Sequence, residues 1–413
     1  MKRVFNTFRN IINFPDRQLT SRGAEPKMNN KHVLKPGTYY LQGAQACLEG
    51  AIAAGCRVYG GYPITPASEI MEHAAQRIPQ VGGRFIQMED EIASACVLLG
   101  ASWAGKKAMT ATSSPGFSLM QEAISYGIMS ETPLVIVDVQ RPGPGQGYVT
   151  TSQEDVMQAR WGHHGEGSTI SLAPASVQEM YEFTIEAFNL SEQWRTPVLI
   201  MTEETVAHMR ERLVVPPIEE IQIIPRKKPQ DLGIPPEDYL PWGHDIVAPM
   251  ANWGEGYNVN HIGLVHLEDG NITQYDLEMH DRCVKRLQAK IEGNVDKIAK
   301  VETRYIETCK HLVICYGSVS RTAIEAVMEA RESRGLDIGF LRLKTLWPFP
   351  EDKLREIIES VDTIFVPEMN LGMMKHPITE ALRDRCKKVV SIPSLGSLHT
   401  PEYILSKIHE EIR

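Results

Sequence analysis

The sequence lacks any pair of cysteines with the spacing of a metal-binding motif. Its seven cysteines are Cys47, Cys56, Cys96, Cys283, Cys309, Cys315 and Cys386. Without a C-x-x-C pair, an iron–sulfur cluster or a structural zinc held by this chain alone is not expected. Several of these cysteines lie in apolar patterns, as buried reduced thiols do. We therefore expect a reducing compartment and a cytoplasmic protein.

Two further absences concern membranes and nucleic acids. No run of about 18 apolar residues occurs, so no membrane span is expected. The 43 basic residues are outnumbered by 52 acidic ones, and the net charge of −9 argues against a nucleic-acid partner. The pattern G-x-G-x-x-G is absent from the first strand–helix turns, and "YGSVS" at 316–320 is too short for a dinucleotide-binding turn.

Length and composition suit a globular protein of two or three domains, with 42% hydrophobic and 23% charged residues. Residues 1–35 stand apart from the rest. Their stretch "MKRVFNTFRNIINF" is basic with spaced apolar residues, and it lacks the continuous apolar core of a secretory signal. An organelle transit peptide, a docking arm and a disordered extension all fit this pattern, and we favour an arm or extension.

From residue 36 to residue 213, short apolar strands alternate with amphipathic helices. We expect strands at 57–61, 84–88, 107–113, 133–139 and 197–202, and helices at 44–55, 68–78, 90–105, 117–130 and 177–194. Apolar strands of this length that alternate with helices predict an α/β fold built on a doubly wound parallel sheet.

Residues 214–304 break this alternation. The stretch "VVPPIEEIQIIPRKKPQDLGIPPEDYLPW" is rich in proline and has little periodicity, so we expect a linker, followed by a helical connection at 278–302. In residues 305–413 we expect strands at 312–317, 337–343, 363–368 and 389–393, and helices at 321–333, 350–360 and 401–412. These residues predict a second, smaller α/β domain.

The stretch "VYGGYPITPASEI", residues 58–70, concentrates backbone stiffness around Thr65. Each proline fixes its own φ and keeps the preceding residue out of the α region, so Tyr62 and Thr65 are expected to be extended. Gly60 and Gly61 allow a ligand or another backbone to approach closely. A binding turn and an ordinary strand-to-helix turn, with proline at the first helical position, both fit this pattern.

Acidic residues follow the strand expected at 84–88. Glu89, Asp90 and Glu91 would open the next helix, where carboxylates cap free N–H groups and favour the helix dipole. Glu91 also precedes the apolar stretch "IASACVLLGASWAG". Partial desolvation there could keep its carboxyl protonated and suit it to general acid catalysis, so capping and catalysis both remain open.

A small polar loop follows the strand expected at 107–113. Thr112, Ser113, Ser114 and Gly116 precede a helix in "TATSSPGFS". Their N–H groups could receive an anion or the polar edge of a cofactor, or the loop could simply cap the helix.

The next loop, "QRPGPGQG", begins with an arginine at the end of the strand expected at 133–139. Arg141 is well placed there for a bidentate contact with a carboxylate, although an ordinary surface position also suits it. His163 and His164 follow in "RWGHHGEG" without a cysteine or aspartate at metal-ligand spacing. We interpret this pair as loop residues and assign no metal ligand to the chain.

Together these stretches resemble the α subunit of 2-oxoacid:ferredoxin oxidoreductases. The motifs that carry the resemblance are "GYPITPASEI", "MEDEIASACVLLGASWAGKKAMTATSSPGFSLM", "ETPLVIVDVQRPGP", "TPVLIMTEETVAHMRE", "LRLKTLWPFP" and "VPEMNLGMM". The resemblance covers residues 43–413. It implies that residues 36–213 are the pyrimidine-binding domain of the thiamine diphosphate fold, and that residues 305–413 are similar to the C-terminal domain of transketolase.

The resemblance also implies site residues. Glu91 aligns with the catalytic glutamate that bonds N1′ of the aminopyrimidine ring. Thr65 aligns with a threonine that faces the substrate carboxylate and keto oxygen, and Arg141 aligns with an arginine that clamps the carboxylate. Gln146 is a further implied substrate contact. The implied cofactor contacts are Glu91, Tyr62, Pro63, Ile64, Thr112, Ser113 and Phe117.

The resemblance implies several partner subunits. In this family a β subunit holds the diphosphate and Mg²⁺ and carries an iron–sulfur cluster, and we expect γ and ferredoxin-like δ subunits, with ferredoxin as electron acceptor. The sequence fits this division of labour, because its nearest string to a G-D-G…N diphosphate motif is "EDGN" at 268–271, with no strand before it. The chain alone should therefore be inactive.

The implied reaction is the reversible, CoA-dependent oxidative decarboxylation of a 2-oxoacid. The stretch "QEDVMQARWG" resembles the 2-oxoglutarate branch, although "GPGQG" at 143–147 replaces that branch's common G-P-S-T-G. A phenylglyoxylate- or branched-chain-specific enzyme with a flavin or NAD acceptor subunit is the alternative. A non-catalytic scaffold is a third reading, which the presence of Glu91, Thr65 and Arg141 disfavours.

Overall fold

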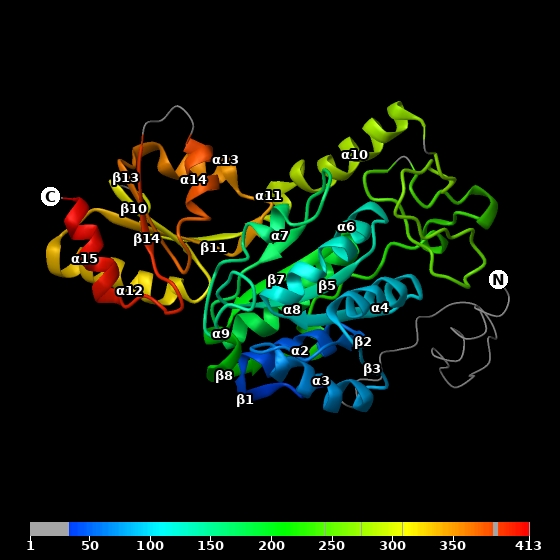
Figure 1. Ribbon diagram of the computed structural model, residues 1–413, viewed down its shortest axis with the longest axis horizontal. Helices are drawn as coiled ribbons and strands as arrows, with labels where there is room; N and C mark the ends of the chain where they lie inside the picture. The colour runs from blue at the N-terminus through cyan, green and yellow to red at the C-terminus, as the bar shows by residue number, and fades with distance from the viewer. Residues whose placement is uncertain (1–32, 244, 274, 308, 383–386, 413) are drawn as a thin grey trace. The chain divides into compact units, whose positions relative to one another are not determined.

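The computed structural model describes residues 33–243, 245–273, 275–307, 309–382 and 387–412. Of the predicted N-terminal extension, residues 1–35, the first 32 residues lie outside the described residues. Cys386 also lies outside them. Two sheets and a two-stranded ribbon organise the described chain (Figure 1). Their alternation with helices confirms the expected α/β class.

The first sheet consists of seven strands: β2 (Cys56–Gly61), β3 (Arg84–Gln87), β4 (Lys107–Thr112), β5 (Leu134–Gln140), β6 (Ile170–Leu172), β7 (Pro197–Glu203) and β12 (Thr345–Trp347). Their order across the sheet is β12–β6–β7–β5–β4–β2–β3. The neighbouring pairs from β6 to β3 are parallel, and β12 joins β6 in the antiparallel direction.

Helices cover both faces of the first sheet. They are α2 (Gly43–Ala53), α3 (Ser68–Gln80), α4 (Glu91–Trp103), α5 (Ser114–Leu119), α6 (Gln121–Met129), α7 (Gln158–Trp161), α8 (Val177–Trp194) and α9 (Glu204–His208). Val135 and Val137 of β5 belong to a core shared with α2, α3 and α8, whereas Leu134 and Ile136 belong to a core shared with α4 and α6. Because successive side chains of a strand point to opposite faces, this alternation confirms the doubly wound arrangement.

The second sheet consists of β9 (Val301–Arg304), β10 (His311–Tyr316), β11 (Ile338–Leu343), β13 (Thr363–Glu368) and β14 (Lys388–Pro393). Its order is β14–β13–β10–β11–β9, and only the β11–β9 pair is antiparallel among these strands. Its helices are α12 (Val319–Arg334), α13 (Glu351–Ile357), α14 (Lys375–Leu382) and α15 (Pro401–Glu411). Val313 packs with α12 and α15, whereas Ile314 packs with α13 and α14, so helices again cover both faces.

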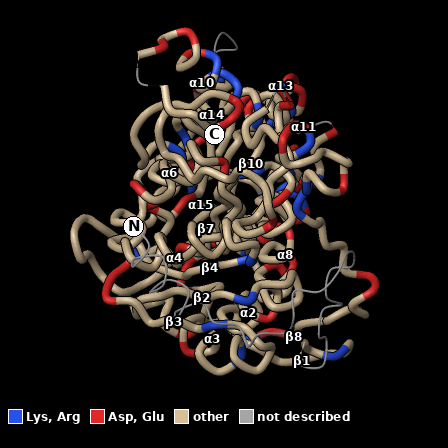
Figure 2. Tube along the Cα trace, turned by 90° about the vertical axis from the view of Figure 1, so that its right-hand side faces the viewer, with Lys and Arg blue, Asp and Glu red and all other residues tan. Residues whose placement is uncertain are grey.

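The remaining elements belong to neither sheet. They are β1 (Gly37–Gln42), β8 (Arg210–Val215), α10 (Leu277–Glu292), α11 (Val295–Ile298) and the 3₁₀ turns η2 (Ile218–Glu220), η3 (Gln230–Leu232), η4 (Pro236–Asp238) and η5 (Ile358–Ser360). β1 and β8 pair with each other in an antiparallel ribbon. Acidic and basic residues are interspersed along the trace (Figure 2). Among the described helices, none has the length and apolar character that a membrane crossing requires.

Two predicted helices differ from the structure by more than small shifts at their ends. The helix expected at 117–130 begins at Ser114 and is interrupted at Met120, which separates α5 from α6. Its earlier start follows from Pro115, because proline suits the first helical turn. The helical connection expected at 278–302 ends at residue 298, after a break at Gly293, and residues 301–304 instead form the edge strand β9.

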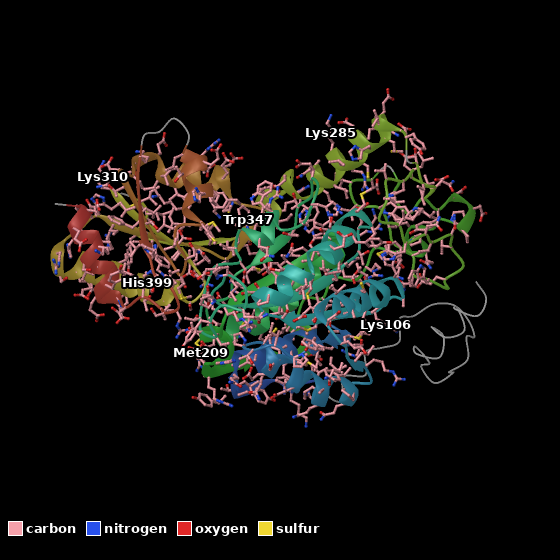
Figure 3. The ribbon with its side chains drawn as sticks, in the orientation of Figure 1. Lys106, Met209, Lys285, Lys310, Trp347 and His399 are labelled. Carbon is pink, nitrogen blue, oxygen red and sulfur yellow. The ribbon has the colours of Figure 1, made fainter. Side chains whose placement is uncertain are left out.

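β12 carries part of the C-terminal region into the first sheet. Its three residues follow β11 directly, yet they pair with β6. Trp347, labelled in Figure 3, donates from Nε1 to the Val156 carbonyl oxygen at 2.7 Å. A strand of three residues carries too little periodicity to be recognised in the sequence, so this crossing was not expected.

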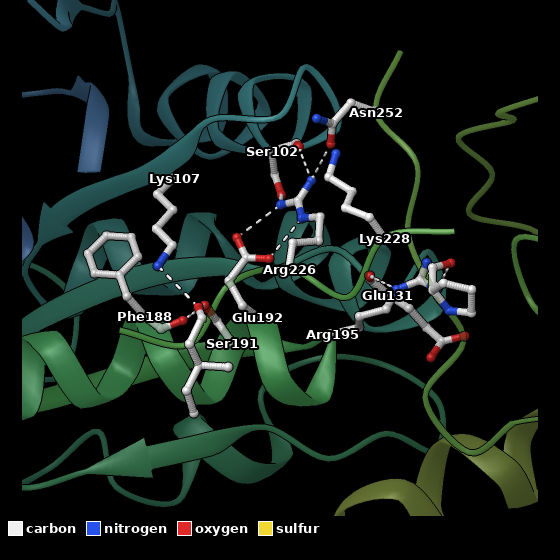
Figure 4. A network of polar contacts seen from close by, with 12 residues as sticks. Ser102, Lys107, Glu131, Phe188, Ser191, Glu192, Arg195, Arg226, Lys228 and Asn252 are labelled. Carbon is white, nitrogen blue, oxygen red and sulfur yellow. Dashed lines mark hydrogen bonds and ion pairs between the residues drawn. The ribbon is translucent and has the colours of Figure 1, made fainter. Parts of the chain in front are cut away.

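Arg226 anchors the proline-rich segment to the helices of the first sheet (Figure 4). Its guanidinium donates to the two carboxylate oxygens of Glu192 on α8 at 2.8 and 3.0 Å. It also donates to the Ser102 carbonyl oxygen on α4 at 2.7 Å and to Asn252 Oδ1 at 3.0 Å. Charge-assisted hydrogen bonds of this kind hold a segment that has little secondary structure of its own.

Candidate functional site

Four candidate segments meet at one edge of the first sheet. β3, β2, β4 and β5 are neighbours and run parallel, so their carboxyl ends lie at the same edge. Glu91 follows β3, Thr65 follows β2, Ser113 follows β4 and Arg141 follows β5. The predicted site residues therefore come from four adjacent strand ends.

The turn after β2 combines an exposed rim with a partly buried anchor. Tyr62, Pro63 and Thr65 are exposed, whereas Ile64 packs against the core that α2 and α3 share. The Thr65–Pro66 peptide is cis. The turn thus presents Thr65 at the sheet edge while Ile64 holds it on the core.

Glu91 is the first residue of α4 and is only 6% exposed. The helix cap is Asp90, whose carboxylate accepts a 2.7 Å hydrogen bond from the Ala93 N–H. Glu91 is therefore not needed as the cap, and its carboxyl lies beside Gly116 of α5. A methyl group at Gly116 would lie 2.5 Å from Glu91 Oε1 and 2.2 Å from Thr112 Oγ1, so glycine is required for this close approach.

Two more predicted cofactor contacts follow β4. Ser113 is fully buried, and its hydroxyl has no hydrogen-bond partner among the described residues. Phe117 is also fully buried and packs in the core that α4 and α6 share. A buried hydroxyl without a partner is unfavourable unless a ligand completes it. Together with the buried Glu91 carboxyl, these residues fit the polar edge of a heterocycle such as an aminopyrimidine.

Arg141 joins the loop after β5 to the turn after β2. It is 6% exposed, which excludes an ordinary surface position. Its Nη1 donates to the Thr65 carbonyl oxygen at 2.7 Å, and its Nη2 donates to Gln146 Oε1 at 3.0 Å. Its Nε has no partner among the described residues. The structure therefore brings the three predicted substrate residues into one cluster.

The loop that carries Gln146 is held in shape by the Glu154 side chain and by a glycine. The Gly143 N–H donates to Glu154 Oε2 at 3.0 Å, which ties the start of the loop to its end. Gly147 has a φ of +55°, and a Cβ there would lie 1.6 Å from the Pro142 carbonyl oxygen. The glycine at 147 is required for this loop shape, which holds Gln146 near the arginine.

Sequence reasoning missed two buried carboxyls behind Arg141. Asp138 lies inside β5 with no exposed surface, and Asp155 is 7% exposed in the loop that follows. The two side chains lie within hydrogen-bonding reach of each other. Burial raises the pKa of Asp138 well above its usual range and that of Asp155 to about 6. The available signal was an aspartate inside the apolar run "PLVIVDV", because buried strands rarely contain a free charge.

A third buried carboxyl, that of Glu203, ends β7. It is 1% exposed and accepts hydrogen bonds from Gln153 Nε2 at 2.6 Å and from the Ser318 N–H at 3.2 Å. Burial raises its pKa to about 7. Because Ser318 precedes α12, this carboxylate links the loop after β5 to the second sheet, a contact between residues far apart in the sequence.

The two adjacent histidines have different surroundings. Burial lowers the pKa of His163, whereas His164 is exposed and lies 3.4 Å from Glu122. Within the ranges that the structure describes, no three histidine, cysteine, aspartate or glutamate side chains are grouped as metal ligands. The pair is a feature of its loop, and it does not join the cluster around Arg141.

Protein families match both halves of the chain. Residues 49–286 match the family described as "Pyruvate flavodoxin/ferredoxin oxidoreductase, thiamine diP-bdg". Residues 309–402 match "Pyruvate:ferredoxin oxidoreductase core domain II". The first match includes all the candidate site residues and describes a domain that binds thiamine diphosphate.

Two relatives illustrate the range of similar proteins. The 2-oxoglutarate synthase subunit KorA of Methanocaldococcus jannaschii is 48% identical over 366 residues, which cover 88% of this chain and 97% of that protein. The ketoisovalerate oxidoreductase subunit VorB of Methanothermobacter thermautotrophicus is 34% identical over 375 residues, which cover 90% of this chain and 97% of that protein.

Solved structures agree with the fold. The 2-oxoglutarate:ferredoxin oxidoreductase from Magnetococcus marinus, with 2-oxoglutarate, coenzyme A and succinyl-CoA bound, matches with a TM-score of 0.85 at 31% identity. The match covers 99% of this chain and 69% of that chain. A split-gene transketolase in an inactive tetramer matches with a TM-score of 0.52 at 13% identity and covers 89% of this chain and 95% of that chain, which indicates a similar fold only.

Proposed function

The chain belongs to the pyruvate flavodoxin/ferredoxin oxidoreductase family, and from this premise we propose that it is the alpha subunit of a 2-oxoglutarate:ferredoxin oxidoreductase. The proposed reaction converts 2-oxoglutarate and CoA into succinyl-CoA and CO₂ and passes two electrons to ferredoxin, in either direction. The observation that carries the proposal is the cluster of Thr65, Arg141 and Gln146, which lies at the sheet edge to which Glu91 also belongs.

Thiamine diphosphate, when bound, supplies a nucleophilic carbon for the keto group and a cationic ring that takes up the electron pair released as the 2-oxoacid loses CO₂. Glu91 would hold a proton at N1′ of the aminopyrimidine ring, because its carboxyl is buried and is not used to cap α4. Thr112 and Ser113 would meet the polar edge of the ring. The apolar contacts would come from Tyr62, Pro63, Ile64 and Phe117.

Arg141 would bind the carboxylate of the 2-oxoacid. Its guanidinium is nearly buried and already oriented by Thr65 and Gln146, so little conformational entropy remains to be lost when substrate binds. The Thr65 hydroxyl, on an exposed turn that Ile64 anchors to the core, would orient the keto group. Low local water content strengthens such charge-assisted hydrogen bonds.

The identity of the 2-oxoacid rests on the relatives and on one loop. The 2-oxoglutarate relative, at 48% identity, is more similar to this chain than the ketoisovalerate relative, at 34%. Gln146 is neutral and contacts Arg141, and this observation favours a branched-chain or aromatic 2-oxoacid as a second candidate. The distal group of the substrate therefore distinguishes the two candidates.

A partner subunit would complete the site. The segments that follow β2, β3, β4 and β5 contain large apolar side chains that are 38–74% exposed. These residues are Tyr62, Ile92, Leu119, Tyr148 and Val149. Exposed apolar groups gathered around a site favour a protein interface. We assign the diphosphate, Mg²⁺ and an iron–sulfur cluster to a β subunit, and γ and ferredoxin-like δ subunits to the same assembly.

The described cysteines are free thiols, which supports a reducing compartment such as the cytoplasm.

The test is anaerobic co-expression of this chain with the partner subunits encoded beside it. The purified assembly is assayed for CoA-dependent reduction of a viologen dye with 2-oxoglutarate, pyruvate, branched-chain and aromatic 2-oxoacids. We expect 2-oxoglutarate to give the highest kcat/KM, and an assembly with Glu91→Gln to give almost no reduction. Preference for a branched or aromatic acid would transfer the chain to the second candidate, and no activity with any acid would contradict the proposal.

A further inference from the structure

Ser114 connects the main chain of Arg141 to a buried carboxyl. Its Oγ accepts a 2.9 Å hydrogen bond from the Arg141 N–H and lies 2.9 Å from the Arg141 carbonyl oxygen. The same hydroxyl donates to the Asp155 carboxylate. Ser114 begins α5 and is only 9% exposed. One hydroxyl therefore fixes the backbone from which the Arg141 guanidinium extends.

Asp155 also has an acidic neighbour, Asp138. Asp138 of β5 is fully buried, and neither of its carboxylate oxygens has a donor partner among the described residues. It lies within hydrogen-bonding reach of Asp155. Two adjacent buried carboxyls cannot both be ionised without a large electrostatic cost, so they are stable when they share a proton.

We propose that Asp155 and Asp138 are positioning residues for Arg141, which share one proton and act on the arginine through Ser114. Asp138 keeps the proton and donates it to Asp155 in a hydrogen bond. Asp155 stays ionised and accepts from both Asp138 and Ser114. Ser114 in turn accepts from the Arg141 N–H, so the hydrogen bonds converge on the Asp155 carboxylate from both sides.

The charges around Asp155 agree with this assignment. Burial raises its pKa to about 6, the hydrogen bonds from Ser114 and Asp138 lower it, Glu154 raises it and Arg141 lowers it. The pKa of Asp138 is raised further, chiefly by burial and then by Asp155. At neutral pH the proton therefore stays on Asp138 and the negative charge stays on Asp155, next to the arginine.

These hydrogen bonds matter because Arg141 must keep its orientation before the substrate binds. If Ser114 loses its hydroxyl, the Arg141 N–H and the Asp155 carboxylate both lose a partner in a buried setting, and such losses are costly. The guanidinium would then sample other orientations, and the 2-oxoacid would bind more weakly. This kinetic consequence rests on the proposed function, whereas the shared proton and the fixed backbone do not.

Two readouts independent of activity test the proposal on the assembled complex. Infrared difference spectra of wild type minus Asp138→Asn at pH 8.5 should contain the C=O stretch of a protonated carboxyl. In hydrogen–deuterium exchange, the peptide that contains Arg141 should exchange faster in Ser114→Ala and Asp155→Asn, but not in Glu368→Gln, which alters a buried carboxyl of the second sheet. A missing infrared band would overturn the shared proton, and unchanged exchange would overturn the positioning role.

The kinetic readout separates positioning from general damage. We expect Ser114→Ala and Asp155→Asn to raise KM for 2-oxoglutarate about tenfold while kcat changes by less than about threefold, since a buried partner of a charged group is lost. Asp138→Asn keeps a donor for Asp155 and should lose less than Asp138→Leu. Equal losses for Asn and Leu would contradict the shared proton. A wild-type assembly that turns over no 2-oxoacid would contradict the proposed function, while the spectra and exchange rates would still decide this proposal.

Discussion

Arg141 donates from Nη1 to the carbonyl oxygen of Thr65 over 2.7 Å, although 76 residues separate them in the sequence. The contact joins the turn after β2 to the loop after β5, across the intervening strand β4. Prolines stiffen both segments, and the contact fixes one against the other. The stiffness around Thr65 therefore serves a contact between strand ends, as pre-organisation of a binding site requires.

Replacement of Arg141 by methionine should weaken capture of the 2-oxoacid more than it slows the chemical step. A hydrogen bond to a charged group contributes about 1.5–3 kcal/mol, so KM for 2-oxoglutarate should rise roughly tenfold to a hundredfold. Steady-state kinetics of the assembled complex measure the change. Arg212→Met, at an exposed position of β8, is the matched control and should keep the wild-type KM. An Arg141→Met enzyme with normal KM would remove this residue from the substrate site.

Gly116→Ala should lower affinity for thiamine diphosphate. The new methyl group would lie 2.5 Å from Glu91 Oε1 and 2.2 Å from Thr112 Oγ1, so both side chains must move. Gly100→Ala in α4 is the control, because a Cβ there meets no atom within 4 Å and alanine favours the helix. Isothermal titration of the cofactor into the apo-assembly should reveal weaker binding for Gly116→Ala alone. Equal affinities would argue that the cofactor does not approach Gly116.

Glu131→Gln should destabilise the fold. Glu131 is fully buried and contacts Lys290 Nζ at 2.8 Å, and Arg286 and Arg195 also act on its carboxylate. Removal of the negative charge leaves buried cations uncompensated, which costs about 3–5 kcal/mol. Glu186→Gln removes an exposed pair with Lys300 and should cost about 1 kcal/mol or less. Denaturant unfolding measures both, and similar costs would contradict the role of the buried network.

Glu203→Gln should reduce the pH dependence of stability. Burial raises the Glu203 pKa from its ordinary 4.5 to about 7, so the folded state binds this proton more tightly than the unfolded state. The resulting stabilisation is present below pH 4.5 and is lost as the pH rises to about 7. Glutamine does not titrate, so the variant should lose less stability than wild type between pH 5 and 8. Thermal unfolding at several pH values measures this, and parallel curves would contradict the assignment.

Much of the fold was predictable because local patterns are strong. α8 was predicted at 177–194 and begins and ends there, since Ser176 accepts a hydrogen bond from the Glu179 N–H and so caps it. β13 was likewise predicted at 363–368, a run buried along its whole length. Apolar periodicity and caps predict these elements, because both signals depend only on residues that are close together in the sequence.

The remaining features depend on contacts that no local pattern encodes. β12 was missed because its three residues gain a partner only when the C-terminal region reaches β6. Asp138 could be noticed as a charge in an apolar strand, but its pairing with Asp155 depends on the loop that follows. The candidate site was found through its motifs, and the structure adds that Arg141 contacts both Thr65 and Gln146. The catalytic and binding roles of these residues stay predictions.

The most direct test of the account concerns Glu91. The measurement is the rate at which the C2 proton of bound thiamine diphosphate exchanges with deuterium in the assembled complex, followed by acid quench and proton NMR. If Glu91 holds the proton at N1′, Glu91→Gln should slow this exchange by about a hundredfold or more, as the loss of a general acid does, while the subunits still assemble. Exchange at the wild-type rate in the Gln variant would contradict the central claim that this chain activates the cofactor.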